Sequence, residues 1–162
     1  MTISVGDKLP AATLLQMGAE GPEAIELASK TKGRKVVIFG LPGAYTGTCS
    51  TAHVPSFIRT KDALAAKGVD EVICLSVNDP FVMGAWGEAT GASAAGIAML
   101  GDAEATLTKA LGLEFSAPPA GLIDRSKRYA LVAEDGVVTV LQIEDNAGEC
   151  NISAGESVVD AL

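Results

Sequence analysis

The amino-acid sequence predicts a three-layer α/β protein with a mixed β-sheet, and two observations lead to that prediction. Apolar, β-branched runs alternate with segments of helical periodicity, which is typical of strand–helix–strand units whose helices cover a sheet. Close to the C-terminus, Asp135-Gly136 separates two further apolar runs and indicates an antiparallel hairpin. With 162 residues, 48% of them hydrophobic, we expect one domain over residues 1–162.

The predicted strands stand out by their content of Val, Ile and Leu. The run at 36–41 is almost continuously apolar, which is typical of a central strand covered on both faces. The polar stretch at 30–35, which contains Gly33, is expected to be a loop. Further strands are predicted at residues 11–17, 69–77, 97–100, 129–133 and 137–143.

The predicted helices lie between and after these strands. The longest is expected over residues 46–66, with a bend at Pro55 and with Gly68 as its C-cap. Asn78-Asp79-Pro80 is a turn signal that introduces the next helix. Shorter helices are expected at residues 81–90, from Asp102 as N-cap to about Gly112, and at 155–162.

Charge and composition limit the partners and the compartment that we expect. Twenty acidic against twelve basic side chains give a formal net charge of -8, so nucleic acid and anionic membrane surfaces would repel the protein. The first residues lack the basic and apolar blocks of a secretory signal, and no apolar run is long enough to span a membrane. We therefore expect a soluble, cytoplasmic protein.

The three cysteines have different surroundings. Cys74 lies in an apolar strand and is expected to be a small buried side chain. Cys150 has polar neighbours, which favours exposure. Cys49 follows the central strand by eight residues and lies in the first turn of the long predicted helix, where unpaired N–H groups and the helix dipole favour a thiolate.

The spacing Pro42-x-x-x-Thr46-x-x-Cys49 is the most informative pattern in the chain. With Thr46 as N-cap, its hydroxyl is expected to reach the amide of Cys49, which holds hydroxyl and thiol together on one turn. Pro42 removes an N–H group and can shield the thiolate from water. The alternative is a capped helix with an incidental cysteine.

The segment PGAYTGTCSTAHVP, residues 42–55, closely resembles the active-site segment of the type II, or atypical two-cysteine, peroxiredoxins. Residues 68–86 and 127–132 are also similar to this class, so the resemblance covers nearly the whole chain. It implies a thioredoxin-like fold, in which helices flank a mixed central β-sheet with a C-terminal β-hairpin. Two departures from the family are Tyr45, where many members have Phe, and Gly47, where many have Pro.

The resemblance also implies a thiol-dependent peroxidase without cofactor or metal. Cys49 would attack hydrogen peroxide or an alkyl hydroperoxide and become a sulfenic acid, which glutathione with glutaredoxin, or thioredoxin, would then reduce. Thr46 would hydrogen-bond the reacting oxygens, Pro42 would shape the pocket, and an arginine would stabilise the thiolate. Relatives commonly form homodimers, for which Phe81, Val82 and Trp86 are candidate contacts, although their helical spacing also fits a core.

Other residues leave alternatives open. The family arginine directly precedes an aromatic residue, so Arg128 before Tyr129 fits that role, whereas Arg125 is expected to be exposed or at the pocket rim. His53 shares a helix face with Cys49; the matching family histidine is usually a supporting element of the active-site helix, and a direct role as the base is the alternative. Cys150 lies near the position of the resolving cysteine of animal members, but an internal disulfide with Cys49 requires an approach that sequence does not reveal.

Three other functions are weighed against the peroxidase. A thioredoxin-type oxidoreductase normally has a second cysteine three residues after the first, and here that residue is Ala52. A zinc site has only Cys49 and His53 at ligand spacing, which is too few ligands. A non-catalytic redox sensor or partner-binding switch would use the same thiol, but stoichiometrically rather than with turnover.

Overall fold

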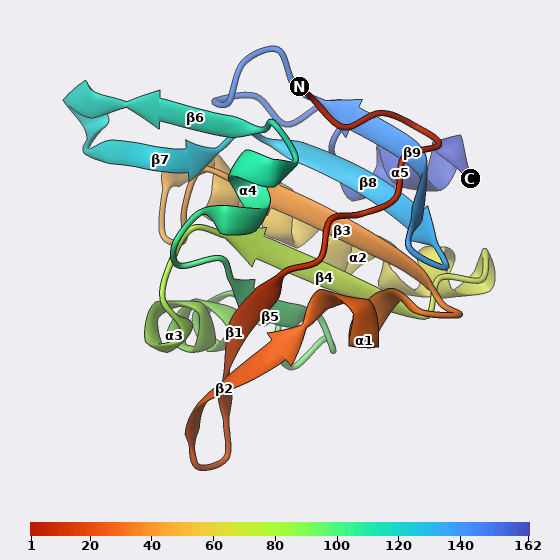
Figure 1. Cartoon of the computed structure of the whole chain (residues 1–162), viewed down its shortest axis with the longest axis horizontal. Helices are drawn as coiled ribbons and strands as arrows, with labels where there is room; N and C mark the ends of the chain where they lie inside the picture. Colours follow the sequence, from red (N-terminus) through yellow and green to blue (C-terminus); the bar gives the residue numbers. More distant parts are fainter.

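The computed structural model describes residues 1–162, and its centre is a seven-stranded mixed sheet in the order β2-β1-β5-β4-β3-β8-β9 (Figure 1). Strands β3, β4 and β5 run parallel, whereas β8 and β9 are antiparallel to their neighbours. The sheet and its C-terminal hairpin are as predicted. The strands are Thr13–Gly18 (β1), Gly21–Glu26 (β2), Lys35–Leu41 (β3), Glu71–Ser76 (β4), Ala98–Gly101 (β5), Tyr129–Glu134 (β8) and Val137–Ile143 (β9).

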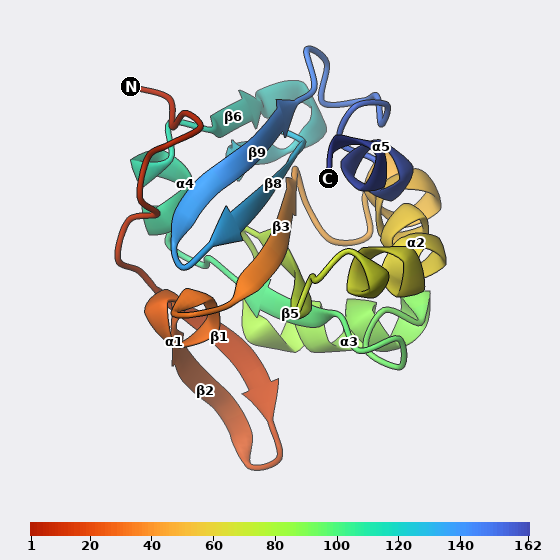
Figure 2. The ribbon, with the colours of Figure 1, turned by 90° about the vertical axis from the view of Figure 1, so that its right-hand side faces the viewer.

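Helices cover both faces of this sheet, which gives the three predicted layers (Figure 2). One face carries α2, α3 and α5, and the other carries α1 and α4. Because successive side chains of a strand point to opposite faces, Val37 and Phe39 of β3 enter one apolar cluster and Val36 and Ile38 the other. The helices are Leu27–Thr31 (α1), Val54–Ala66 (α2), Pro80–Thr90 (α3), Thr106–Ala110 (α4) and Gly155–Ala161 (α5). No helix has both the length and the apolar character needed to span a membrane.

The long helix predicted over residues 46–66 is divided into two elements. Cys49–His53 forms a π-helix, η1, and α2 follows from Val54. Pro55 lies in the first turn of α2, where its missing N–H group is tolerated. The π-helical segment therefore lies directly before Pro55, and it begins with Cys49.

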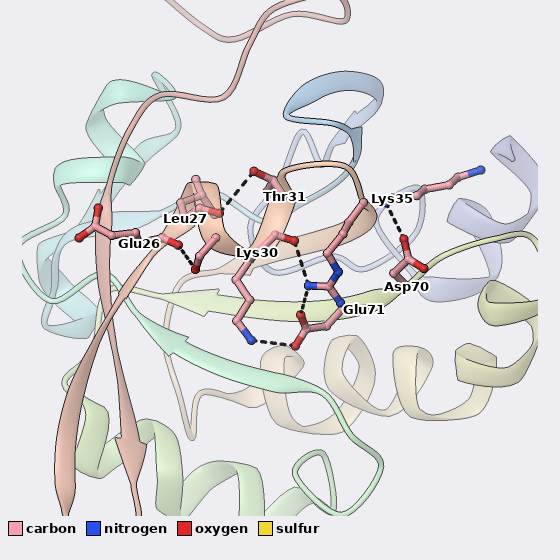
Figure 3. A network of polar contacts seen from close by, with 9 residues as sticks. Glu26, Leu27, Lys30, Thr31, Lys35, Asp70 and Glu71 are labelled. Atoms are coloured by element: carbon pink, nitrogen blue, oxygen red, sulfur yellow. Dashed lines mark hydrogen bonds and ion pairs between the residues drawn. The ribbon is translucent and has the colours of Figure 1, made fainter.

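The predicted loop at 30–35 is partly wrong, because its first residues belong to α1. Lys30 Nζ and Arg34 Nη1 each lie 3.0 Å from a carboxylate oxygen of Glu71 at the start of β4 (Figure 3). Leu27, the first residue of α1, is buried in the core. Tertiary contacts with Glu71 and the core thus hold a short helix in a segment whose polar composition indicates a loop.

The sequence analysis missed one edge strand and a separate two-stranded sheet. Strand β2 is largely exposed and contains Pro22, so it lacks the apolar alternation that identifies strands. The second sheet pairs Glu114–Ala117 (β6) with Leu122–Ser126 (β7) around the 3₁₀ turn Pro118–Ala120 (η2), and it projects beyond the main sheet (Figure 1). Its residues are mostly exposed, and therefore no buried pattern marks it.

Candidate active site

The fold brings Cys49 and Arg128 together at one end of the sheet. Strand β3 ends at Leu41, and the loop that follows leads directly into η1 and Cys49. Strand β8 is antiparallel to β3 and pairs Tyr129 with Gly40, so Arg128, one residue before β8, lies beside the end of β3. Residues 79 positions apart in the sequence therefore meet.

The Arg128 guanidinium group donates three hydrogen bonds, and the residue is only 2% exposed. Nη2 donates to the sulfur of Cys49 at 3.1 Å, and Nη1 donates to Nδ1 of His53 at 3.0 Å. Nε donates to the carbonyl of Ala147, also at 3.0 Å. Each of the three guanidinium nitrogens has its own acceptor. Because the group is planar and rigid, these three bonds fix its orientation relative to the sulfur.

Arg128 takes part in none of the five ion pairs of the structure. Of the groups that its guanidinium contacts, only the sulfur of Cys49 can carry a negative charge. A buried cation without a partner charge is costly, and a thiolate at this position offsets that cost. The positive charge of Arg128 thus lies directly against the sulfur, with no carboxylate beside it.

His53, the only histidine of the chain, holds Arg128 and does not contact the sulfur. Burial, together with the positive charge of Arg128, lowers the pKa of His53 from 6.5 to about 3, so the ring is neutral near pH 7. Nδ1 accepts from Arg128, and Nε2 therefore carries the proton and donates to the carbonyl of Ser153 at 3.0 Å. The ring therefore links Arg128 to the main chain at Ser153.

The predicted capping interaction of Thr46 with Cys49 is absent. The Thr46 hydroxyl donates to the carbonyl of Gly43 at 2.7 Å, and no side chain caps η1. The backbone amide of Ser50 donates to the Thr46 carbonyl at 3.1 Å, so the first turn is helical, and the capping bond is missing because the Thr46 hydroxyl is directed to Gly43 instead. Thr46 nevertheless keeps the acceptor lone pairs of its hydroxyl oxygen free for another donor.

Pro42, Thr46 and Arg128 line one pocket of about 260 Å³. Phe115 of β6 and Leu122 of β7 supply apolar side chains to its wall, so the sheet that the sequence did not predict borders the site. The remaining lining residues are Gly47, Thr48, Ala147 and Gly148. Cys49 itself is fully buried and is not among the lining residues. Arg128 lines the pocket and also donates to the sulfur of Cys49, so it connects the two.

Arg125 does not contact Cys49. Its Nη1 donates to the carbonyl of Pro42 at 3.1 Å, and a carbon added at Gly43 would lie 2.4 Å from the same nitrogen. The side chain is half-buried, and its partner Pro42 is one of the residues that line the pocket. Of the two candidate arginines, Arg128 alone reaches the sulfur.

The other two cysteines are also free thiols. Cys74 is fully buried in the core, as predicted, and burial raises its pKa well above the ordinary value. Cys150 is half-buried, and burial is also the main reason that its pKa is raised; the Ser153 side chain acts in the opposite direction. Cys150 is thus a protonated thiol in a loop that borders the site.

The fold and the thiol–arginine pair define the class of the protein as a redoxin, and a family model described as Redoxin matches residues 4–159. The chain is 49% identical to Peroxiredoxin-2E-2, chloroplastic, of Oryza sativa subsp. japonica, with 99% of this chain and 73% of that protein covered. It is 42% identical to Peroxiredoxin-2D of Arabidopsis thaliana, with 99% and 98% covered. The chain belongs to the peroxiredoxin family and is a thiol-dependent peroxidase.

Solved structures agree with this assignment. A structure of reduced Prx3 in complex with H2O2 from Vibrio vulnificus superposes with a TM-score of 0.91 at 45% identity and covers 99% of each chain. The thioredoxin-like peroxiredoxin fold expected from the sequence is thereby confirmed.

The cytoplasmic location expected from the sequence is wrong on these comparisons. Similar relatives include the chloroplastic protein named above and Peroxiredoxin-2F, mitochondrial, of Arabidopsis thaliana, which is 45% identical over 131 residues. The expectation was based on composition and on the first residues, and relatives with comparable sequences belong to organelles.

Proposed function

We propose that Cys49 is the nucleophile with which this peroxidase reduces hydrogen peroxide and alkyl hydroperoxides. The observation that supports this assignment best is the 3.1 Å contact between Arg128 Nη2 and the sulfur, in a site where the guanidinium has no carboxylate partner. The thiolate attacks one peroxide oxygen, an S–O bond forms and the O–O bond breaks. Cys49 becomes a sulfenic acid, and the other oxygen takes up a proton and leaves as water or an alcohol.

Arg128, Thr46 and Pro42 have separate roles in this step. Arg128 stabilises the thiolate before the attack and the negative charge that develops on the leaving oxygen. Thr46 accepts a hydrogen bond from the peroxide O–H group, because its own hydrogen is directed to the Gly43 carbonyl. Pro42 has no N–H group that could compete for the peroxide, and its carbonyl is already occupied by Arg125. The pocket that these residues line also has an apolar wall, which suits an alkyl substituent.

The sulfenic acid is reduced by an external thiol in this proposal. The reductant is either glutathione together with glutaredoxin, or thioredoxin. Its thiol condenses with the sulfenic acid to form a mixed disulfide and release water. A second thiol then cleaves the mixed disulfide and restores Cys49. Cys150 is a weaker candidate for this step because its raised pKa keeps it protonated. The proposed partners are a peroxide and a thiol reductant. We also propose a second copy of the chain, in a homodimer.

The direct test measures peroxide consumption with either reductant system for the wild type, Cys49→Ser and Cys74→Ser. Cys74 is the matched control, since it is another fully buried thiol of the same core. We expect Cys49→Ser to lose all turnover and Cys74→Ser to retain it. Turnover by Cys49→Ser would remove Cys49 from its role, and a wild type that reacts once without turnover would indicate a redox sensor.

A second experiment addresses the reduction step. Cys150→Ser is compared with the wild type in the same assay, first with glutathione and glutaredoxin and then with thioredoxin. If an external thiol acts directly on Cys49, at least one system sustains wild-type turnover in the variant. Loss of turnover with both systems, while the first reaction with peroxide remains fast, would instead make Cys150 the resolving thiol.

A further inference from the structure

The loop between β9 and α5, residues 144–154, contacts the active site through three backbone carbonyls. Ala147 accepts from Arg128 Nε at 3.0 Å, and Gly148 accepts from the hydroxyl of Thr48 at 2.8 Å. Ser153 accepts from Nε2 of His53 at 3.0 Å. Because carbonyls of this loop are the partners of site side chains, the position of the loop determines where those side chains lie.

Glu144, the first residue of this loop, holds its far end. One carboxylate oxygen, Oε2, accepts from the amide of Asn151 at 2.6 Å, the amide of Ser153 at 2.9 Å and the hydroxyl of Ser153 at 2.6 Å. The backbone amide of Glu144 also donates to the carbonyl of Arg128 at 2.9 Å. A single residue thus contacts both the main chain of Arg128 and the turn that carries Ser153.

The side chain of Glu144 is buried, with 7% of the residue exposed, and it forms no ion pair with any lysine or arginine. A buried carboxylate without a cation is costly, so hydrogen bonds must stabilise its charge. Hydrogen bonds to an ionised acceptor are about twice as strong as neutral ones. Three such bonds to one oxygen therefore fix the Ser153 turn firmly.

These contacts form a continuous path to the reactive sulfur. Both donor groups of Ser153 are held by Glu144, and the carbonyl of Ser153 holds Nε2–H of His53. The opposite nitrogen of His53 accepts from Arg128, which contacts Cys49. The order along the path is Glu144, Ser153, His53, Arg128 and Cys49.

We propose that Glu144 is a positioning residue of the peroxidase, which acts through Ser153 and His53 to hold the Arg128 guanidinium against the sulfur of Cys49. The inference rests on the proposed roles of Cys49 and Arg128 and adds a residue that lies outside the pocket. Glu144 does not line the pocket and has no contact with the sulfur. Its effect on the reaction is therefore an effect on geometry.

Two substitutions separate the length of the Glu144 side chain from its charge, and a third serves as the control. Glu144→Gln keeps the length and a carbonyl acceptor but loses the charge. Glu144→Asp keeps the charge but withdraws the acceptor by one methylene from the three donors. Glu149→Ala is the matched control, because Glu149 lies in the same loop, is exposed and makes no side-chain hydrogen bond.

Two measurements on the fully reduced protein report the geometry of the site. The first is the second-order rate constant for one reaction with hydrogen peroxide. The second is the pH profile of Cys49 alkylation by iodoacetamide, quantified on the Cys49 peptide by mass spectrometry so that Cys150 does not contribute. The groups that face Cys49 are Arg128, neutral His53 and the buried thiol of Cys74, and the variants change none of them directly.

We expect Glu144→Asp to lower the rate constant roughly tenfold or more, since a displacement of about 1 Å at a reacting group can cost about a hundredfold. Its alkylation profile moves to higher pH, Glu144→Gln lies between Glu144→Asp and the wild type because it keeps the acceptor but loses the charge, and Glu149→Ala matches the wild type. A folded Glu144→Asp with wild-type rate and profile overturns the proposal, and so does a Glu149→Ala that is as impaired as Glu144→Asp. An inactive wild type would overturn the proposed function instead.

Discussion

At the scale of single residues, the site depends on a buried arginine rather than on the position of the thiol alone. The Arg128 guanidinium joins Cys49, His53 and the carbonyl of Ala147, and no carboxylate competes for its charge. Lysine cannot replace this fork, because an ammonium group is a point charge without fixed donor directions. His53 completes the arrangement as a neutral acceptor, which requires that its ring stays unprotonated.

That requirement predicts a pH dependence of stability. Folding lowers the pKa of His53 from 6.5 to about 3, so between these values the unfolded chain binds one more proton at this residue than the folded protein. The free energy of unfolding therefore falls as the pH drops through this window, by up to about 1.4 kcal/mol per pH unit. Above pH 6.5 the contribution of this residue is constant.

The measurement is urea unfolding of the wild type and His53→Gln at several values between pH 4 and 7. Carboxylates contribute equally to both proteins, and His53 is the only histidine, so the difference between the two curves isolates its titration. We expect the wild type to lose more stability than the variant on acidification. Parallel curves would contradict a buried neutral imidazole.

At the scale of elements, helix α5 anchors the loop that borders the active site. It packs against α2, and Arg59 of α2 pairs with Glu156 of α5 at 2.7 Å. Gly155, its first residue, donates its amide to the Ser56 hydroxyl at 2.9 Å. Both helices adjoin site segments, since α2 continues η1 and α5 follows Ser153, so their docking fixes the distance between the two segments.

Gly155 allows this close approach, which predicts a loss of stability for Gly155→Ala. A β-carbon there would lie 2.5 Å from the carbonyl oxygen of Ser56, a backbone atom that cannot move without the helix. We expect the free energy of unfolding to fall by about 1–3 kcal/mol, measured by urea denaturation. Gly47→Ala is the control, because an added β-carbon meets nothing within 4 Å there. Equal effects of the two substitutions would rule out the helix contact as the cause.

At the scale of the whole molecule, exposed aromatic side chains gather around α3. Phe81 is 63% exposed and Tyr45 58% exposed, and the Tyr45 ring lies 6.4 Å from that of Trp86 in α3. Trp86 itself is fully buried, so of the candidate dimer contacts it belongs to the core. Exposed aromatic rings on α3 and beside it favour an interface, which supports the proposed homodimer.

The homodimer proposal predicts that Phe81→Asp dissociates the protein. A carboxylate in an apolar interface would lose its hydration without gaining a partner, so association weakens. Sedimentation equilibrium at micromolar concentration measures the change. Ile123→Asp is the control, as Ile123 is similarly exposed, at 56%, but lies on β7. A monomeric wild type, or dissociation of the control to the same extent, would contradict the proposed interface.

The active-site residues could be predicted from sequence wherever the signal is local. The spacing of Pro42, Thr46 and Cys49 lies within eight residues, whereas Arg128 was chosen over Arg125 through the family resemblance, in which the arginine precedes an aromatic residue. The capping role of Thr46 was wrong, because its hydroxyl is directed to the carbonyl of Gly43 rather than to the amide of Cys49. Glu144 was missed, since nothing in its neighbourhood shows that its carboxylate is buried.

The sequence by itself determined most strands of the main sheet, the longer helices, the mixed α/β class and the candidate thiol, because periodicity, turn residues and helix starts act over a few positions. Tertiary structure alone decided the pairing of Arg128 with Cys49, the neutral state of His53 and the apolar wall from β6 and β7. These features arise when segments far apart in the chain are packed together and water is removed, and both distance and burial are properties of the folded molecule.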